Sequence, residues 1–131
     1  MRLTRPTLLA CACACLVAAC GGGEPTDAFD KDFAQAKANT ASGPGKAYDA
    51  TINKVMEESN AIEDVMLCYG TDHGPPRDSY RGVMRFAADG GFAIEMRPDD
   101  EFSRCMVREF EQVEVPEPPA RPYLLPVEIG G

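Results

Sequence analysis

Residues 82–97 read GVMRFAADGGFAIEMR, and this stretch decides the fold. Apolar and polar residues alternate on both sides of the turn sequence Asp89-Gly90-Gly91, which is typical of a β-hairpin. Successive side chains of a strand point to opposite faces, so the hairpin has one apolar and one polar face. We expect Met84, Phe86, Phe92, Ile94 and Met96 on the apolar face, and Arg85, Glu95 and Arg97 on the other.

A sheet with one solvated face needs a single covering layer. The residues before the hairpin supply it, because residues 46–68 carry apolar residues at steps of three and four, which predicts one long helix. At 1.5 Å per residue this helix is about 33 Å long. The predicted buried stripe comprises Tyr48, Ile52, Val55, Ile62, Val65 or Met66, and Tyr69, and Ser59 interrupts it.

A second, shorter helix is predicted after Pro98, capped by Asp99 or Asp100 and ending near Phe110. Its inner side is expected to carry Phe102, Cys105, Met106 and Phe110.

The last predicted element is a strand over residues 123–129, in which Pro126 indicates an edge position because proline has no N–H to donate. The prolines at 116, 118, 119 and 122 exclude regular structure before it. The order helix-strand-strand-helix-strand predicts an α+β fold of two layers, with the long helix packed on a small antiparallel sheet. Ser42-Gly43-Pro44-Gly45 places the start of this domain at residue 46, so it covers residues 46–131.

The N-terminus carries Arg2 and Arg5, then the apolar residues 8–19, and then Cys20. The apolar stretch is shorter than the roughly 20 residues that a spanning helix needs, but it suits a secretory signal. The run Val17-Ala18-Ala19-Cys20 resembles the lipobox of bacterial lipoproteins. The resemblance implies a signal peptide over residues 1–19 and lipid on Cys20. The alternative is an ordinary signal peptide with an incidental cysteine. The composition of residues 20–45 predicts a flexible linker, in which the Ala-rich residues 28–41 form at most a helix that is barely stable alone.

Gly21 after the lipobox resembles the outer-membrane class of these lipoproteins. We therefore expect a periplasm-facing protein held at the outer membrane through the lipid on Cys20, with the inner membrane or the cell surface as alternatives. Several acyl chains anchor a protein stably without any spanning helix.

Two cysteines remain once the signal peptide and Cys20 are set aside, namely Cys68 and Cys105. An even pair in an oxidising compartment predicts a disulfide. A metal site is the competing interpretation, but no second thiol or histidine lies at ligand spacing from either cysteine.

The chain after the signal peptide is acidic. Its 21 Asp and Glu face 11 Lys and Arg (13 less Arg2 and Arg5), which gives a formal charge of −10. Nucleic-acid binding needs a basic surface, so this class of partner is not expected.

Several short segments together resemble the TonB-like C-terminal domain in its two-cysteine AgmX type. They are Cys68-Tyr69, Gly82-Val83-Met84-Arg85-Phe86 with Asp89-Gly90, Arg104-Cys105-Met106, and Val115-Pro116-Glu117-Pro118 with the final strand. The chain departs from that family in its His73-Gly74-Pro75-Pro76 loop, in Val115 where the family has an aromatic residue, and in lacking a spanning anchor and a long Pro-rich spacer. The resemblance implies that a protein partner adds to an edge strand. The candidate binding residues are then Tyr123, Leu125, Val127 and Ile129.

The sequence offers little catalytic chemistry. His73 is the only histidine and lies in a Gly/Pro loop, and the paired carboxylates are more consistent with a solvated surface. We therefore expect a non-catalytic protein-interaction or scaffold module without cofactor, metal or small-molecule substrate. One alternative is an inhibitor or chaperone that docks through the acidic helix face around Glu57 and Glu63. A further alternative is a cell-wall hydrolase, which needs two carboxylates about 5 to 10 Å apart.

Overall fold

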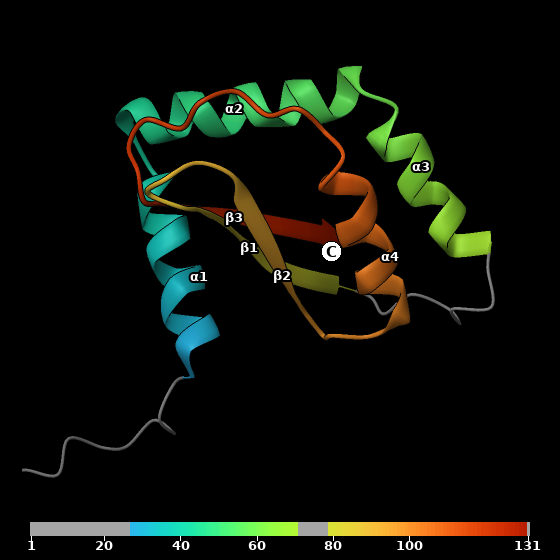
Figure 1. The fold of residues 1–131 in the computed structure, drawn as a ribbon. Helices are drawn as coiled ribbons and strands as arrows, with labels where there is room; N and C mark the ends of the chain where they lie inside the picture. The colour runs from blue at the N-terminus through green and yellow to red at the C-terminus, as the bar shows by residue number, and fades with distance from the viewer. Residues whose placement is uncertain (1–26, 71–78, 131) are drawn as a thin grey trace, which may run out of the picture.

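The computed structural model describes residues 27–70 and 79–130 of the chain. Four helices and a three-stranded antiparallel sheet make up this part, which confirms the α+β class (Figure 1). In chain order the elements are α1 (Ala28–Asn39), α2 (Gly43–Glu58), α3 (Ala61–Leu67), a short 3-10 helix (Cys68–Gly70), β1 (Ser79–Phe86), β2 (Phe92–Arg97), α4 (Glu101–Phe110) and β3 (Tyr123–Gly130).

The predicted hairpin is confirmed, and the sheet has the order β2-β1-β3. Strand β1 is central, with Met84 opposite Ile94 of β2 and Leu125 of β3. The turn uses Gly90 and Gly91 at φ values of 107° and 74°, which a side chain at Cβ would disfavour. Strand β1 starts at Ser79, before the predicted Gly82, because its first residues pair with the end of β3.

The expected apolar face forms the core. Met84, Phe86, Ile94, Met96 and Leu125 are buried against side chains from the helices α2, α3 and α4. The inner side of α4 is also as predicted, since Phe102 and Met106 are fully buried there.

The predicted long helix is wrong, because it breaks into α2 and α3 at Ser59 and Asn60. The Ser59 N–H donates to the Val55 carbonyl at 2.9 Å, and the Ser59 hydroxyl accepts from the Ala61 N–H at 3.3 Å. A serine side chain that bonds neighbouring backbone groups in this way competes with the helix. The break changes the buried stripe, which continues as Ala61, Val65 and Cys68 while Ile62, Met66 and Tyr69 are exposed.

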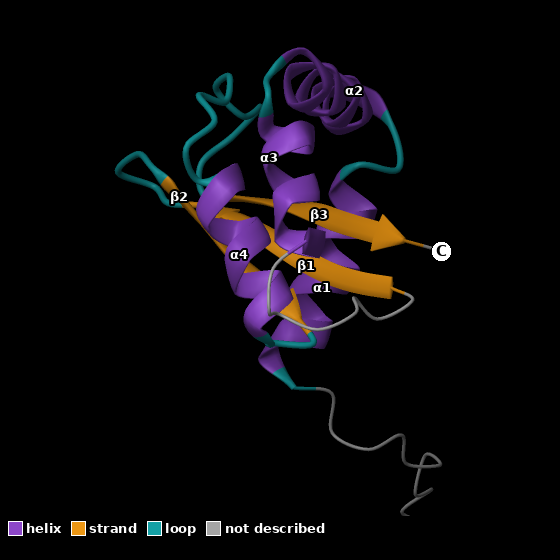
Figure 2. Ribbon diagram, turned by 90° about the vertical axis from the view of Figure 1, so that its right-hand side faces the viewer, coloured by secondary structure: helices purple, strands orange, loops and turns teal. Residues whose placement is uncertain are grey.

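The predicted two-layer arrangement is also wrong, because α1 covers the second face of the sheet. Figures 1 and 2 show the strands between α1 on one side and α4 on the other. Phe29 is only 3% exposed and clusters with Ala36 and Val83. The guanidinium of Arg81 lies 5.8 Å and 5.3 Å from the ring centroids of Phe29 and Phe33.

Within the described residues the packed structure includes α1 from Ala28 and does not start at Lys46, so the predicted linker over residues 20–45 contains a packed helix. Twelve residues make a marginal helix in isolation, and tertiary packing supplies the missing stability. Arg85 adds to this packing through its 2.9 Å ion pair with Asp32.

Helix α4 starts with the predicted cap. An Asp100 carboxylate oxygen accepts from the Ser103 N–H, and the Ser103 hydroxyl accepts from the Asp100 N–H, both at 2.9 Å. The predicted disulfide between Cys68 and Cys105 is present, with 6.0 Å between the two Cα atoms. It joins the end of α3 to the middle of α4.

The segment between α4 and β3 has no regular structure and is held by Arg121. The Arg121 guanidinium donates to the Ala87 carbonyl at 2.8 Å and forms an ion pair with Glu117 at 2.5 Å. The Tyr48 hydroxyl donates to the Pro116 carbonyl at 2.7 Å. These contacts fix the chain across the end of the sheet before it enters β3.

Candidate functional site

The four expected binding residues of β3 point into the protein rather than outward. Tyr123 and Leu125 are buried in the core, and Val127 and Ile129 are partly buried against it. Val127 and Ile129 line a hollow of about 230 Å³ between β3 and α2, which also reaches Ile52. Their side chains therefore form the wall of a groove beside the edge strand.

The backbone edge of β3 is partly closed. The Asn39 side-chain amide donates to the Leu124 carbonyl at 2.9 Å, so this carbonyl points away from β1. Backbone groups alternate along an antiparallel strand, which places Pro126, Glu128 and Gly130 on the same outer edge. Pro126 has no N–H, and Glu128 pairs with Lys37 of α1 at 2.6 Å.

The outer edge of β2 is different. The Ala87 N–H donates to the Gly91 carbonyl at 3.2 Å, which makes residues 87 and 91 a hydrogen-bonded pair. By alternation from this pair, the backbone groups of Phe92, Ile94 and Met96 point away from β1. Within residues 27–70 and 79–130, no hydrogen-bonding partner is found for these three backbone positions.

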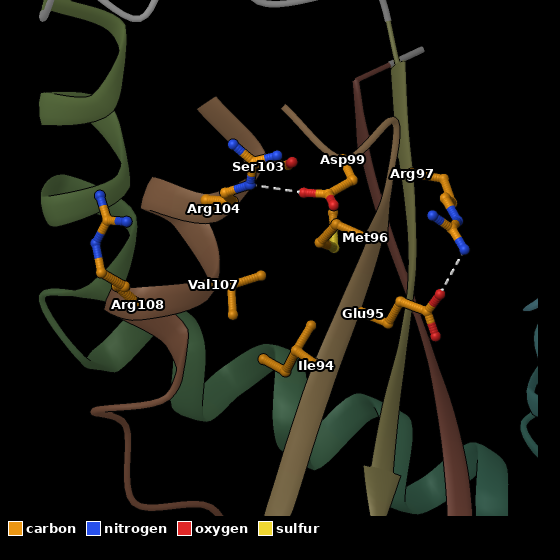
Figure 3. Close-up of a pocket in the computed structure, with 9 residues that line it drawn as sticks. All are labelled: Ile94, Glu95, Met96, Arg97, Asp99, Ser103, Arg104, Val107 and Arg108. Carbon is orange, nitrogen blue, oxygen red and sulfur yellow. Dashed lines mark hydrogen bonds and ion pairs between the residues drawn. The ribbon is translucent and has the colours of Figure 1, made fainter. Parts of the chain in front are cut away.

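A hollow of about 420 Å³ lies along this edge, between β2 and α4 (Figure 3). Ile94, Met96 and Val107 form its apolar part, and the first two are 9% and 4% exposed. Glu95 and Arg97 also line the hollow, although they belong to the opposite face of the sheet. Because residues of both faces contribute, the hollow lies at the free edge of the strand.

The charges around this hollow are mostly paired. Figure 3 shows Arg104 against Asp99 and Arg97 against Glu95, with N–O distances of 2.9 Å and 2.7 Å. Arg108 lines the same hollow from the next turn of α4. No carboxylate in the described parts of the chain forms an ion pair with it, so the rim has one uncompensated positive charge.

A second exposed feature is an apolar patch on α3 and the short helix after it. Ile62, Met66, Leu67 and Tyr69 are between 42% and 68% exposed. Exposed clusters of this kind mark interaction surfaces more often than single exposed residues do. Glu57, Glu58 and Glu63 are exposed on α2 and α3, which gives these helices acidic residues beside the patch.

Sequence reasoning missed both the β2 edge and the α3 patch. A single helix through Ser59 predicts Ile62 and Tyr69 in the buried stripe, with Val65 or Met66, and therefore hides most of the patch. Ser59-Asn60 was the available signal, since both residue types favour helix ends. For the β2 edge no signal existed, because strand order is not readable from the hairpin alone.

Two tyrosines near the start of β3 have a raised pKa. Burial raises the pKa of Tyr48 to about 12, and the nearby Glu117 carboxylate adds to the effect. Burial also raises the pKa of Tyr123, whose hydroxyl is buried without a hydrogen-bond partner in the described structure. The hydrogen bond from Arg121 lowers the pKa of Glu117.

In residues 27–70 and 79–130, no group of three or more His, Cys, Asp or Glu side chains is placed to hold a metal ion. None of the helices in these ranges has the length and apolar character to cross a bilayer. The predicted lipidation site Cys20 and the loop histidine His73 lie outside the described residues.

Comparison of the chain with protein-family models, with curated proteins and with solved structures found no match. The function therefore has to be argued from the residues and the geometry above.

Proposed function

We propose that this chain is a lipid-anchored, non-catalytic protein-interaction module of the bacterial envelope, facing the periplasm from the outer membrane. The observation that carries the proposal is the small sheet whose two edge strands each lie beside a groove. An edge strand presents unpaired N–H and C=O groups to which an extended partner can add.

The TonB-like resemblance is part of this proposal. It is supported by the order of α2/α3, β1, β2, α4 and β3, by the central position of β1, and by the bond between Cys68 and Cys105. Within it, the candidate docking groove is the one that Val127 and Ile129 line. The proline and Asn39 on the β3 edge limit strand addition there to the last residues of the strand.

The lipid on Cys20 defines how far the domain can lie from the membrane. Ala28 starts α1 eight residues after Cys20, and eight extended residues span at most about 28 Å. The domain is therefore held within about one domain diameter of the bilayer. Figure 1 places α3 far from the N-terminal end of α1, so the α3 patch is remote from the anchored end.

The α3 patch favours one second candidate function. An inhibitor or chaperone role needs a surface that docks another protein, and the exposed Ile62, Met66 and Leu67 next to the acidic Glu63 provide one. The partner would then carry apolar side chains flanked by basic residues.

In-cell photo-crosslinking from single positions tests these proposals. One probe replaces Val127 in the β3 groove, another replaces Glu58 on the acidic helix face, and a third replaces the exposed Lys46 as a control. A discrete adduct from position 127 but not 58 supports docking at the β3 groove. An adduct from 58 alone overturns that groove and favours the inhibitor or chaperone role, and no adduct from either position contradicts docking at both of these surfaces.

The anchor is tested separately with Cys20→Ser. The natural chain is expected in the membrane fraction with a mass increased by acyl groups, whereas the variant is expected in the soluble periplasmic fraction. A natural chain without added lipid mass contradicts the lipobox assignment.

A further inference from the structure

The geometry points to a strand-addition site at the outer edge of β2, which takes an extended partner segment with apolar side chains at alternate positions and a carboxylate that pairs with Arg108. The inference rests on the proposed role as an interaction module, and it deepens that role by naming an edge and the chemistry of the partner.

The backbone of β2 is the first argument. Phe92, Ile94 and Met96 each direct an N–H and a C=O outward, and none of the described residues bonds them. These three residues alternate along the strand, so they match the hydrogen-bonding residues of one added antiparallel strand. The β3 edge offers less, because Asn39 occupies the Leu124 carbonyl and Pro126 lacks a donor.

The hollow beside the strand is the second argument. An added strand lies about 4.8 Å from β2 and directs every second side chain toward α4. On that side it meets Ile94, Met96 and Val107, which line the hollow between β2 and α4 (Figure 3). Partner residues at alternate positions are therefore apolar where they face this surface.

The charge at the rim is the third argument. Arg104 already pairs with Asp99, whereas Arg108 has no acidic partner within the described chain. Guanidinium groups bind carboxylates with two parallel hydrogen bonds, which adds geometric selectivity. A carboxylate on the partner, on the same side as its apolar residues, satisfies Arg108.

A second copy of this chain is a poorer occupant of the same edge. A two-fold contact between identical surfaces brings each patch against itself. Pairing β2 with β2 would place the two Arg108 side chains on one shared interface, where the carboxylates of Glu95 and Asp99 already pair with Arg97 and Arg104. The occupant that fits is a different protein segment.

The test uses the full chain as the cell produces it, purified in detergent and labelled with ¹⁵N. The probe is the peptide Glu-Thr-Val-Thr-Val-Thr-Glu, which has valine and glutamate on one side and reads the same in either direction. The control peptide replaces both glutamates with lysine. Arg108→Glu is the test variant, and Lys46→Glu is the matched control, because Lys46 is exposed on α2 and does not line the hollow.

We expect the glutamate peptide to shift the amide signals of Phe92, Ile94 and Met96. Arg108→Glu is expected to weaken binding by about tenfold or more, as for loss of a charge-assisted pair. Lys46→Glu is expected to leave it unchanged, and the lysine peptide is expected to bind more weakly than the glutamate peptide to the natural chain.

Four results would overturn the inference. The first two are amide shifts at Glu128 and Gly130 in place of the β2 residues, and equal binding of the lysine and glutamate peptides. The third is the absence of any shift at about 1 mM peptide. The fourth is a set of shifts at the β2 amides that depends on protein concentration without peptide, which would identify a second copy as the occupant. The crosslinking experiment is independent of Arg108. Crosslinked adducts in the cell, together with no peptide binding in the titration, would support the interaction module and contradict only the β2 site.

Discussion

The two outer edges of this sheet are protected in different ways. At β3, a proline removes one donor, Asn39 occupies one acceptor, and Lys37 pairs with Glu128 over the strand. At β2, no described residue caps the outer backbone groups, and Ile94 and Met96 are only 9% and 4% exposed beside the hollow that α4 lines. Natural sheets use features such as those at β3 against uncontrolled pairing of edges. The β2 edge still allows a specific partner to bind, whereas the capped β3 edge leaves fewer backbone groups for a partner.

The largest effect on the difference between the two edges is expected from removing the disulfide, which holds α4 next to β2. We expect Cys68→Ala with Cys105→Ala to lower the free energy of unfolding by about 2 to 5 kcal/mol. The closed segment spans 37 positions, so much of this effect arises in the unfolded chain. Chemical denaturation measures the loss, and hydrogen exchange should show α4 and β2 losing protection before β3. Equal loss at both edges would contradict the different roles of the edges.

Alkaline pH is expected to lower the stability of the protein at the start of β3. Because the pKa of Tyr48 is raised to about 12, the folded state retains a proton that the unfolded state loses at about 10. Stability is therefore complete below pH 10 and falls as pH rises from 10 to 12. Tyr48 packs against Tyr123, so the start of β3 is expected to loosen first.

Tyr48→Phe isolates this effect. The variant loses the hydrogen bond to the Pro116 carbonyl, at about 1 to 2 kcal/mol near neutral pH. It should also show a smaller fall in stability between pH 10 and 12 than the natural chain. Thermal melts across this range measure both quantities, with Tyr69→Phe as the exposed control. An unchanged alkaline profile would show that Tyr48 is not the titrating group.

The fold was predictable where a local pattern decided it. The hairpin followed from alternation around Asp89-Gly90-Gly91, and the start of α4 from a capping aspartate. The disulfide followed from the count of cysteines. The hairpin and the helix cap depend on residues that are neighbours in the sequence. The disulfide was predictable because only one pair of cysteines is left.

The rest depended on contacts between distant residues. Helix α1 looked too short to be stable alone, and its stability comes from Arg81 and Arg85, about fifty residues later. Arginines that alternate on a strand are typical of a solvated face, although here the Arg81 guanidinium covers Phe29 and Phe33 and the Arg85 guanidinium pairs with Asp32. Pro126 correctly indicated an edge, but the use of Asn39 as a cap on that edge had no local signal.

The cap itself can be removed to make the edges alike. Asn39→Ala should lower stability by about 1 kcal/mol through loss of one hydrogen bond. Combined with Pro126→Val, it gives β3 an uninterrupted edge, and we expect the double variant to self-associate more readily than the natural chain. Sedimentation velocity measures this. The Asn39→Asp variant, which keeps the size but not the donor, is the control, and a monomeric double variant would weaken the capping argument.

The smallest effect is expected at the rim of β2. Arg104 and Asp99 are both more than half exposed, so Arg104→Gln should change the free energy of unfolding by less than about 0.5 kcal/mol. A larger loss would indicate that the ion pair supports α4, and would turn the rim from a recognition feature into a structural one. Denaturant titration of Arg104→Gln beside Lys54→Gln, another exposed pair, gives the measurement.

The bond between Cys68 and Cys105 also makes part of the chain into a covalent ring. Strands β1 and β2 lie inside the ring, whereas α1, α2 and β3 lie on the two arms that leave it. A protease that cuts after Arg77 therefore opens the ring without releasing either piece. The nicked molecule keeps its N-terminal arm joined to both edges of the sheet, and on a denaturing gel the cut becomes visible only after reduction of the disulfide.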